Sequence, residues 1–203
     1  MKLKNKNYTE KEKQELFKKL KRIGNLFGLK LKLKDSERDN YSGAHIGKSK
    51  IDVCCNYNGR LRDKSNITSI MLNNQLTNSV DNISLINKDE YKHFPLLVKI
   101  FLHEISHLLT MNQYDVDRYF DELDDFHMTK PFRWTKYAKK KYHDNYRKLP
   151  YEKLADNLAY HLLCENYDNI INILLGNRVY IKKEIVSKNL ELAKEMKKLY
   201  ISY

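Results

Sequence analysis

The stretch that decides the fold is Leu96–Asn112, which reads LLVKIFLHEISHLLTMN. Apolar residues occupy nearly every side of a helix drawn through it, which is typical of a helix buried in a core, and Pro95 suits the first turn. The polar side chains fall on one stripe, formed by Lys99, His103, Ser106, His107 and Thr110. Because a buried polar group without a partner costs about 1–3 kcal/mol, this stripe must face groups that satisfy it.

Two histidines of the stripe stand four residues apart, in the order His103-Glu104-Ile105-Ser106-His107. Residues at this spacing project from the same helical face, so both imidazoles can reach one zinc ion. Glu104 lies one step around the helix, where it can act as a general base toward water beside the metal. The alternative is a pair of core histidines hydrogen-bonded to backbone carbonyls, in which case Glu104 needs a buried partner of its own.

A catalytic zinc ion usually takes three protein ligands, so the histidine pair needs a third. The longer pattern H-E-x-x-H-x-x-G-x-x-H fails, because Thr110 and Gln113 occupy its glycine and third-histidine positions. A stronger candidate follows Pro150, where Glu152 and Asp156 lie about 40° apart around a predicted helix and so share a face. Glu152 can bind the metal, and Asp156 can accept the free ring N–H of a ligating histidine. Rival ligands stand in the preceding segment: Glu122, Asp124, Asp125 and His127.

Together, H-E-x-x-H at 103–107 and E-x-x-A-D-x-x-A at 152–159 resemble the motifs of the gluzincin-type zincin metallopeptidases. In its short format the chain is similar to the ImmA/IrrE-like soluble metalloproteases of bacteria and their mobile elements. The resemblance implies that His103, His107 and Glu152 hold Zn²⁺ and that Glu104 is the catalytic base. It also implies an antiparallel strand that holds substrate backbone beside the site, with Ile67–Asn73 as its counterpart. The substrate-binding residues would then be Ile67, Thr68, Ser69, Ile70 and Met71.

The order of the predicted elements indicates one α+β domain over residues 1–203. The resemblance implies a zincin-like arrangement of it, in which a small, mostly antiparallel sheet packs on the motif helix. Residues 1–34 read as a basic helix and strand: a capping box at Thr9 and Glu12 opens a helix over 10–27, and Gly28–Lys34 alternates as a strand. Further strands are predicted at Lys50–Tyr57 and Ile67–Asn73. Residues 113–149 are expected to be irregular, and residues 150–203 are expected to form C-terminal helices, the last over about 180–200.

The expected location follows from what the sequence lacks. No run reaches the length of a membrane span, and the first residues are charged without the apolar core of a signal peptide. Cys54, Cys55 and Cys164 show no C-x-x-C spacing, so we expect reduced core thiols. The prediction is a cytoplasmic protein of a bacterial host with no membrane partner, and virion association if a phage encodes it.

The net charge of +12 is spread unevenly along the chain. Residues 1–34 carry 12 Lys and Arg against 3 Glu, residues 115–127 carry 6 acids against 1 Arg, and residues 130–148 carry 8 Lys and Arg against 1 Asp. Basic patches of this kind attract nucleic acid, although a solvated Lys-rich surface gives the same pattern. Nucleic acid is therefore a candidate partner through these patches.

The leading functional hypothesis is a zinc-dependent endopeptidase that hydrolyses a protein or peptide substrate with Glu104 as base. The alternative is a catalytically silent zincin-fold binding protein, associated with nucleic acid or a phage virion, that uses its basic surface. His127 and His143 are candidates to stabilise an oxyanion, or else surface imidazoles. His161 lies on the opposite helix face from Glu152 and is expected to be structural.

Overall fold

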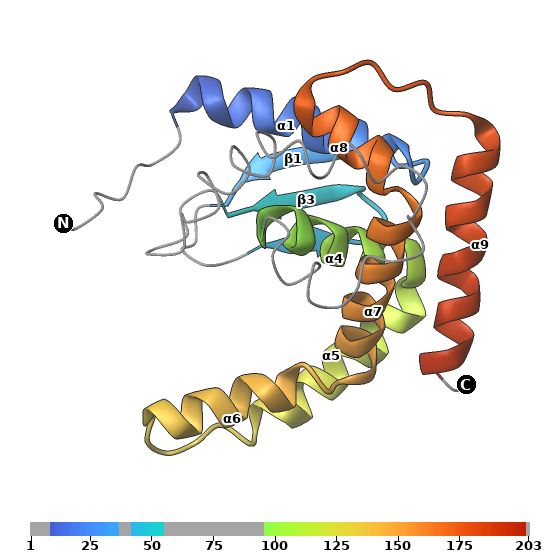
Figure 1. The fold of residues 1–203 in the computed structure, drawn as a ribbon. Coiled ribbons are helices and arrows are strands. Elements are labelled where there is room, and N and C mark those ends of the chain that lie inside the picture. The colour runs from blue at the N-terminus through green and yellow to red at the C-terminus, as the bar shows by residue number, and fades with distance from the viewer. Residues whose placement is uncertain (1–8, 37–41, 55–95, 202–203) are drawn as a thin grey trace.

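The computed structural model of the chain describes residues 9–36, 42–54 and 96–201 (Figure 1). They form an α+β arrangement that is mostly helical, with one three-stranded sheet. Pro95, Cys55 and the expected substrate strand Ile67–Asn73, which includes all five substrate-binding candidates, lie outside the described residues. Those expectations therefore stay predictions.

Helix α1 (Glu10–Asn25) begins with the predicted capping box. The Thr9 hydroxyl oxygen accepts a hydrogen bond from the Glu12 N–H at 3.3 Å, and the Glu12 carboxylate accepts one from the Thr9 N–H at 2.8 Å. Leu20 and Ile23 follow at helical spacing and are fully buried. Local capping and the apolar stripe therefore place this helix as the sequence predicts.

The sheet has the strand order β1-β3-β2, with β1 at Lys32–Asp35, β2 at Gly43–His45 and β3 at Lys50–Val53. β2 pairs with β3 antiparallel, through a turn with left-handed backbone at Gly47 and Ser49. β1 pairs in parallel with the other side of β3, so β3 lies between β1 and β2. The described sheet is thus mixed, and the expectation of a mostly antiparallel sheet is wrong for these strands.

Helix α4 (Leu96–Thr110) carries the histidine motif and contacts α1, α7, α9 and β2. Its apolar side chains form the middle of the core, and Leu102 and Ile105 are fully buried. Two polar groups of its stripe are satisfied within the helix, since Ser106 Oγ donates to the Leu102 carbonyl at 2.8 Å and Thr110 Oγ1 donates to the Ser106 carbonyl at 2.7 Å. His103 and His107 are not satisfied in this way and need partners on another element.

Helices α5 (Gln113–His127) and α6 (Lys136–Tyr146) occupy most of residues 113–149, so the expectation of an irregular segment is wrong. Each helix has its own cap. Asn112 forms a capping box with Asp115, and Thr135 Oγ1 accepts a hydrogen bond from the Ala138 N–H at 3.1 Å. These capping hydrogen bonds begin two helices that the pattern of aromatic and charged residues does not predict.

The two helices lie side by side and project from the rest of the molecule (Figure 1), and we call residues 113–146 the arm. Phe126 packs against Tyr142 with ring centroids 4.5 Å apart, which joins α5 to α6. At the base of the arm, the fully buried Asp115 accepts hydrogen bonds from the Tyr151 hydroxyl at 2.9 Å and from Lys197 Nζ at 2.6 Å. These contacts tie the arm to α7 and α9.

Helix α7 (Pro150–Glu165) starts with proline in its first turn, as predicted, and packs against α4. Its small residues Ala155 and Ala159 are fully buried, which permits close approach of the two helices. Helix α8 (Tyr167–Leu175) follows and packs against α1, and α9 (Lys183–Tyr200) closes the described chain. None of the described helices has both the length and the hydropathy required to cross a membrane.

Candidate metal centre

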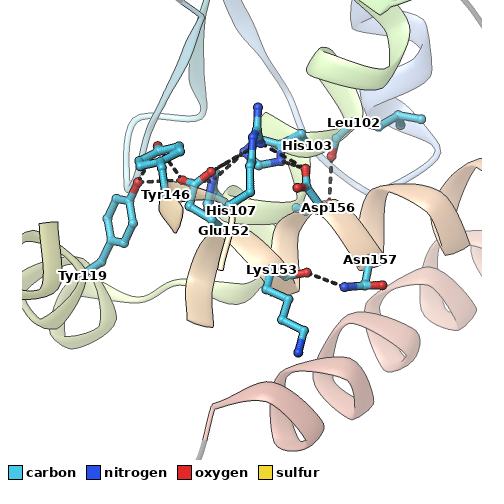
Figure 2. A network of polar contacts seen from close by, with 11 residues as sticks. Leu102, His103, His107, Tyr119, Tyr146, Glu152, Lys153, Asp156 and Asn157 are labelled. Atoms are coloured by element: carbon cyan, nitrogen blue, oxygen red, sulfur yellow. Dashed lines mark hydrogen bonds and ion pairs between the residues drawn. The ribbon is translucent and has the colours of Figure 1, made fainter. Parts of the chain in front are cut away.

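Two neighbouring helices bring three ligand side chains together, as Figure 2 shows. α4 presents His103 and His107, whose Nε2 atoms lie 3.1 Å apart. α7 presents Glu152, whose carboxylate oxygens lie 3.4 Å from His103 Nε2 and 3.5 Å from His107 Nε2. The predicted third ligand is therefore beside the histidine pair, although 44 residues separate it from His107 in the sequence.

The spacing of these atoms suits a single tetrahedral ion. Ligands about 2.0–2.1 Å from zinc at tetrahedral angles lie about 3.3 Å from one another, and the measured separations of 3.1, 3.4 and 3.5 Å fall on both sides of that value. All three side chains are buried. Within the described part of the chain, they are the one group of His, Cys, Asp or Glu side chains whose ligand atoms all lie within 4.8 Å of one another. The group could hold a metal ion.

Asp156 contacts the other nitrogen of His103. Its Oδ1 lies 2.9 Å from His103 Nδ1, so it can accept the Nδ1–H and leave Nε2 facing Glu152. Arg147 Nη1 in turn donates to Asp156 Oδ1 at 3.1 Å and lies 3.5 Å from Glu152 Oε2. Asp156 therefore lies where its predicted role requires, against the ring nitrogen of one histidine. The buried His107 Nδ1, in contrast, has no hydrogen-bond partner among the described residues.

The charges in the site favour a cation. Burial by itself would lower the pKa of His103, but its hydrogen bonds to the Asp156 and Glu152 carboxylates raise that pKa to about 10. Burial would raise the pKa of Glu152, but hydrogen bonds from His103 and His107 hold it well below the usual range. A carboxylate thus faces a protonated imidazole when no metal is bound. A divalent cation can replace that proton, as metal binding to histidine requires.

Glu104 stands next to this group on α4 and lines the same cleft. The side chain is buried, and this burial raises the pKa of its carboxyl above the usual value. A raised pKa brings a carboxylate closer to the range in which a general base is most effective at neutral pH. The environment of Glu104 therefore suits the role predicted from the motif.

Two tyrosines of the arm complete the surroundings of Glu152 (Figure 2). The Tyr119 hydroxyl on α5 donates to Glu152 Oε1 at 2.7 Å, and the Tyr146 hydroxyl on α6 donates to the same oxygen at 2.8 Å. Burial, and then the nearby Glu152 carboxylate, raise the pKa of both tyrosines far above the usual value, so both stay protonated donors. The helical spacing of Val116, Tyr119 and Leu123 predicts an inward face for α5, but no sequence signal joins Tyr119 to Tyr146.

The described residues line a cleft of about 440 Å³ that reaches the three ligands. Its walls come from β2, α4 and α5, with Tyr146 of α6 and Glu152 of α7, and they include His45, Met111 and Phe120. Of the described strands, β2 stands at the end of the sheet order and has a described neighbour on one side only. The cleft is therefore bordered by extended backbone as well as by side chains.

The other candidates from the sequence lie elsewhere. Glu122 lies 3.4 Å from Arg118, Asp124 and Asp125 are exposed, and none of the rival ligands joins the metal group within the described residues. His127 Nδ1 lies 2.8 Å from the Tyr142 hydroxyl. Neither His127 nor His143 is among the described residues that line the cleft, and His161 is exposed on α7.

No family model matches this chain, and neither a curated protein nor a solved structure matches it. The resemblance to gluzincins thus has two sources, the spacing of the motifs and the ligand group that the fold assembles from them.

Proposed function

We propose that the chain is a zinc-dependent peptidase of the gluzincin type. The observation that carries this proposal is the group of His103, His107 and Glu152 at tetrahedral spacing, beside the buried Glu104 and open to a cleft. Structural zinc sites are closed by four protein ligands, whereas three ligands that leave a position open are typical of catalytic zinc. Two imidazoles in a set of three also favour zinc over magnesium or calcium, which prefer oxygen ligands.

Different residues of the chain would bind the metal, transfer the proton and position the ligands during hydrolysis. Zinc bound by the three ligands would polarise the substrate carbonyl and lower the pKa of water. Glu104 takes a proton from the attacking water as the oxygen of that water bonds to the carbonyl carbon. The same carboxyl then delivers that proton to the amine nitrogen as the C–N bond breaks. Asp156 and the two tyrosines hold His103 and Glu152 in place.

A peptide is the substrate that best fits the cleft. β2 borders it, and an extended peptide can add to the end of a sheet through main-chain hydrogen bonds. Tyr119 and Tyr146 line the same cleft and donate their hydroxyl hydrogens to Glu152, so they position that carboxylate beside the substrate. These features support an endopeptidase that holds substrate backbone along β2, in addition to or in place of Ile67–Asn73.

Metal analysis and one isosteric substitution test the proposal. Protein purified without chelators should contain about one zinc ion per chain, and His103→Ala and His107→Ala should each lose it. Glu104→Gln keeps the size of the side chain but removes the base, so zinc content and melting temperature should persist. Its cleavage of fluorescently labelled casein should fall by about 10²–10⁴-fold. Glu122→Gln makes the same chemical change on α5, outside the ligand group, and should cleave normally.

Two results would overturn the proposal. One is a folded protein that binds no zinc, and the other is a Glu104→Gln variant that cleaves as fast as the unmodified chain. Zinc bound at this site without cleavage of any peptide would favour the catalytically silent binding protein instead.

A further inference from the structure

The far end of the arm, residues 128–141, combines cations with exposed aromatic side chains. It carries six Lys and Arg and no acid. Phe132 is 97% exposed, Tyr137 76% and Trp134 52%, and they alternate with the cations along the chain. Large aromatic side chains are seldom left this open unless they meet a partner. We call residues 128–141 the arm tip.

The fold makes little use of these side chains. α6 has no buried residue, and no cation of the arm tip forms an ion pair with a described residue. Of the three aromatics, Trp134 makes a ring contact among the described residues, with its ring centroid 5.2 Å from that of Tyr142. The arm also holds the tip away from the core (Figure 1). The cations and open aromatic rings of the tip therefore contribute little to the stability of the fold.

We propose that the arm tip binds single-stranded nucleic acid. Lysine and arginine side chains contact the phosphates of such a strand, and aromatic rings stack on its unpaired bases, each stacked base contributing about 1–3 kcal/mol. Cations interleaved with open aromatic rings provide both interactions on one surface. This inference goes beyond the proposed peptidase activity and does not depend on it.

The composition argues against an anionic membrane as the partner. Residues 129–148 contain no Leu, Ile or Val, so the segment lacks the aliphatic face that a membrane-surface helix buries. Lys139 and Lys141 also project from nearly opposite sides of α6, about 160° apart, which leaves no continuous apolar stripe. Such a distribution suits a flexible strand that winds over the tip better than a flat surface.

The charge of α5 limits where a strand can lie. Asp117, Asp121, Asp124 and Asp125 are exposed on this helix and repel phosphates. A bound strand therefore follows α6 and the turn before it, and we expect a short site of a few nucleotides, at the low end of the range for such proteins.

Fluorescence anisotropy of the full chain with a labelled oligothymidylate of about 20 nucleotides tests the proposal. Affinity should fall steeply between about 50 and about 200 mM salt, because binding releases counterions. Lys139→Glu with Lys140→Glu should weaken binding and reduce the salt dependence by about two phosphate contacts. The same double change at Lys194 and Lys198 on α9 is the matched control and should have little effect.

The aromatic contribution has its own test. Phe132→Ala should weaken binding by about 5-fold to 150-fold without changing the salt dependence, since it removes stacking and no charge. Phe132→Tyr should restore binding and Phe132→Leu should not. Circular dichroism verifies that each variant is folded, and Glu104→Gln should bind like the unmodified chain.

Three results would overturn the inference: no binding at about 50 mM salt, equal losses from the tip and the α9 control, or binding to phosphatidylserine vesicles or duplex DNA in preference to the single strand.

Discussion

Removing the hydroxyl of Tyr119 or Tyr146 should weaken zinc binding without removing a zinc ligand. Both hydroxyls donate to Glu152 Oε1, at 2.7 and 2.8 Å, and they lie 3.1 Å from each other. They orient the carboxylate before a metal binds. Tyr119→Phe and Tyr146→Phe keep the rings and delete only these donors.

The expected magnitude follows from the shared acceptor. A hydrogen bond to a charged group contributes about 1.5–3 kcal/mol, but in either single variant the second hydroxyl still serves the same oxygen. We therefore expect a loss of about 1 kcal/mol in each single variant, which is about 5-fold in zinc affinity. The double variant leaves Oε1 without a tyrosine donor, and its affinity should fall by about 30-fold to 100-fold, within the range seen when partners of metal ligands are removed. The two losses should be more than additive because the residues share one atom.

Competition with a coloured zinc chelator measures these affinities directly. Tyr137→Phe is the matched control, because it deletes a hydroxyl from an exposed ring of α6 outside the cleft. If the double variant binds zinc within 2-fold of the unmodified chain, about 0.4 kcal/mol, the tyrosines do not prepare Glu152 for a metal. If Tyr137→Phe loses as much affinity as the others, the effect comes from the arm as a whole.

Removing zinc by chelation should lower the melting temperature by about 5–11 °C under conditions where zinc is at about 100 times its dissociation constant. The reason is that an ion held by the ligand group would join α4 to α7, and a chelator that leaves the melting temperature unchanged would contradict this. Asp115→Asn should destabilise the fold by about 3 kcal/mol, because it removes a fully buried carboxylate that is paired with the largely buried Lys197. Asp117→Asn, an exposed change on the same helix, is the control in thermal melts. Burial would raise the pKa of Asp115, but hydrogen bonds from Asn112, Lys197 and Tyr151 hold it below the usual value. The stabilisation is thus present above the unfolded pKa and is lost as pH falls through the lower folded pKa, so the difference from Asp115→Asn should shrink below about pH 4.

The ligand group was predictable because it depends on short, regular spacings. His103 and His107 share a face at four residues apart, and Glu152 and Asp156 do the same on a second helix. Contacts of both acids with His103 confirm that they share a face. A helical period determines these relations before any tertiary contact forms.

The arm and β2 were not predictable from the same signals. α5 and α6 lack a long aliphatic stripe, so their aromatic and charged residues concealed two helices that the caps at Asn112 and Thr135 could have indicated. β2 has three residues, too few for an alternating pattern to stand out. Tyr119 and Tyr146 meet at Glu152 only because the arm folds back on itself, and that contact depends on tertiary packing.

The closed base of the arm separates a part of the chain that tolerates insertion from a part that does not. Tyr119 and Tyr146 meet although 27 positions separate them in the sequence, so the intervening chain leaves the body and returns to the same point. A reporter peptide or fluorophore inserted near Lys130 would lengthen this excursion without shifting a ligand, since exposed turns accept added chain most readily. The same insertion after Tyr146 would separate that residue from Glu152, six positions further on, and would disrupt the site. The arm therefore offers a position for attaching a label near the metal centre, provided that the inserted chain lies between Tyr119 and Tyr146.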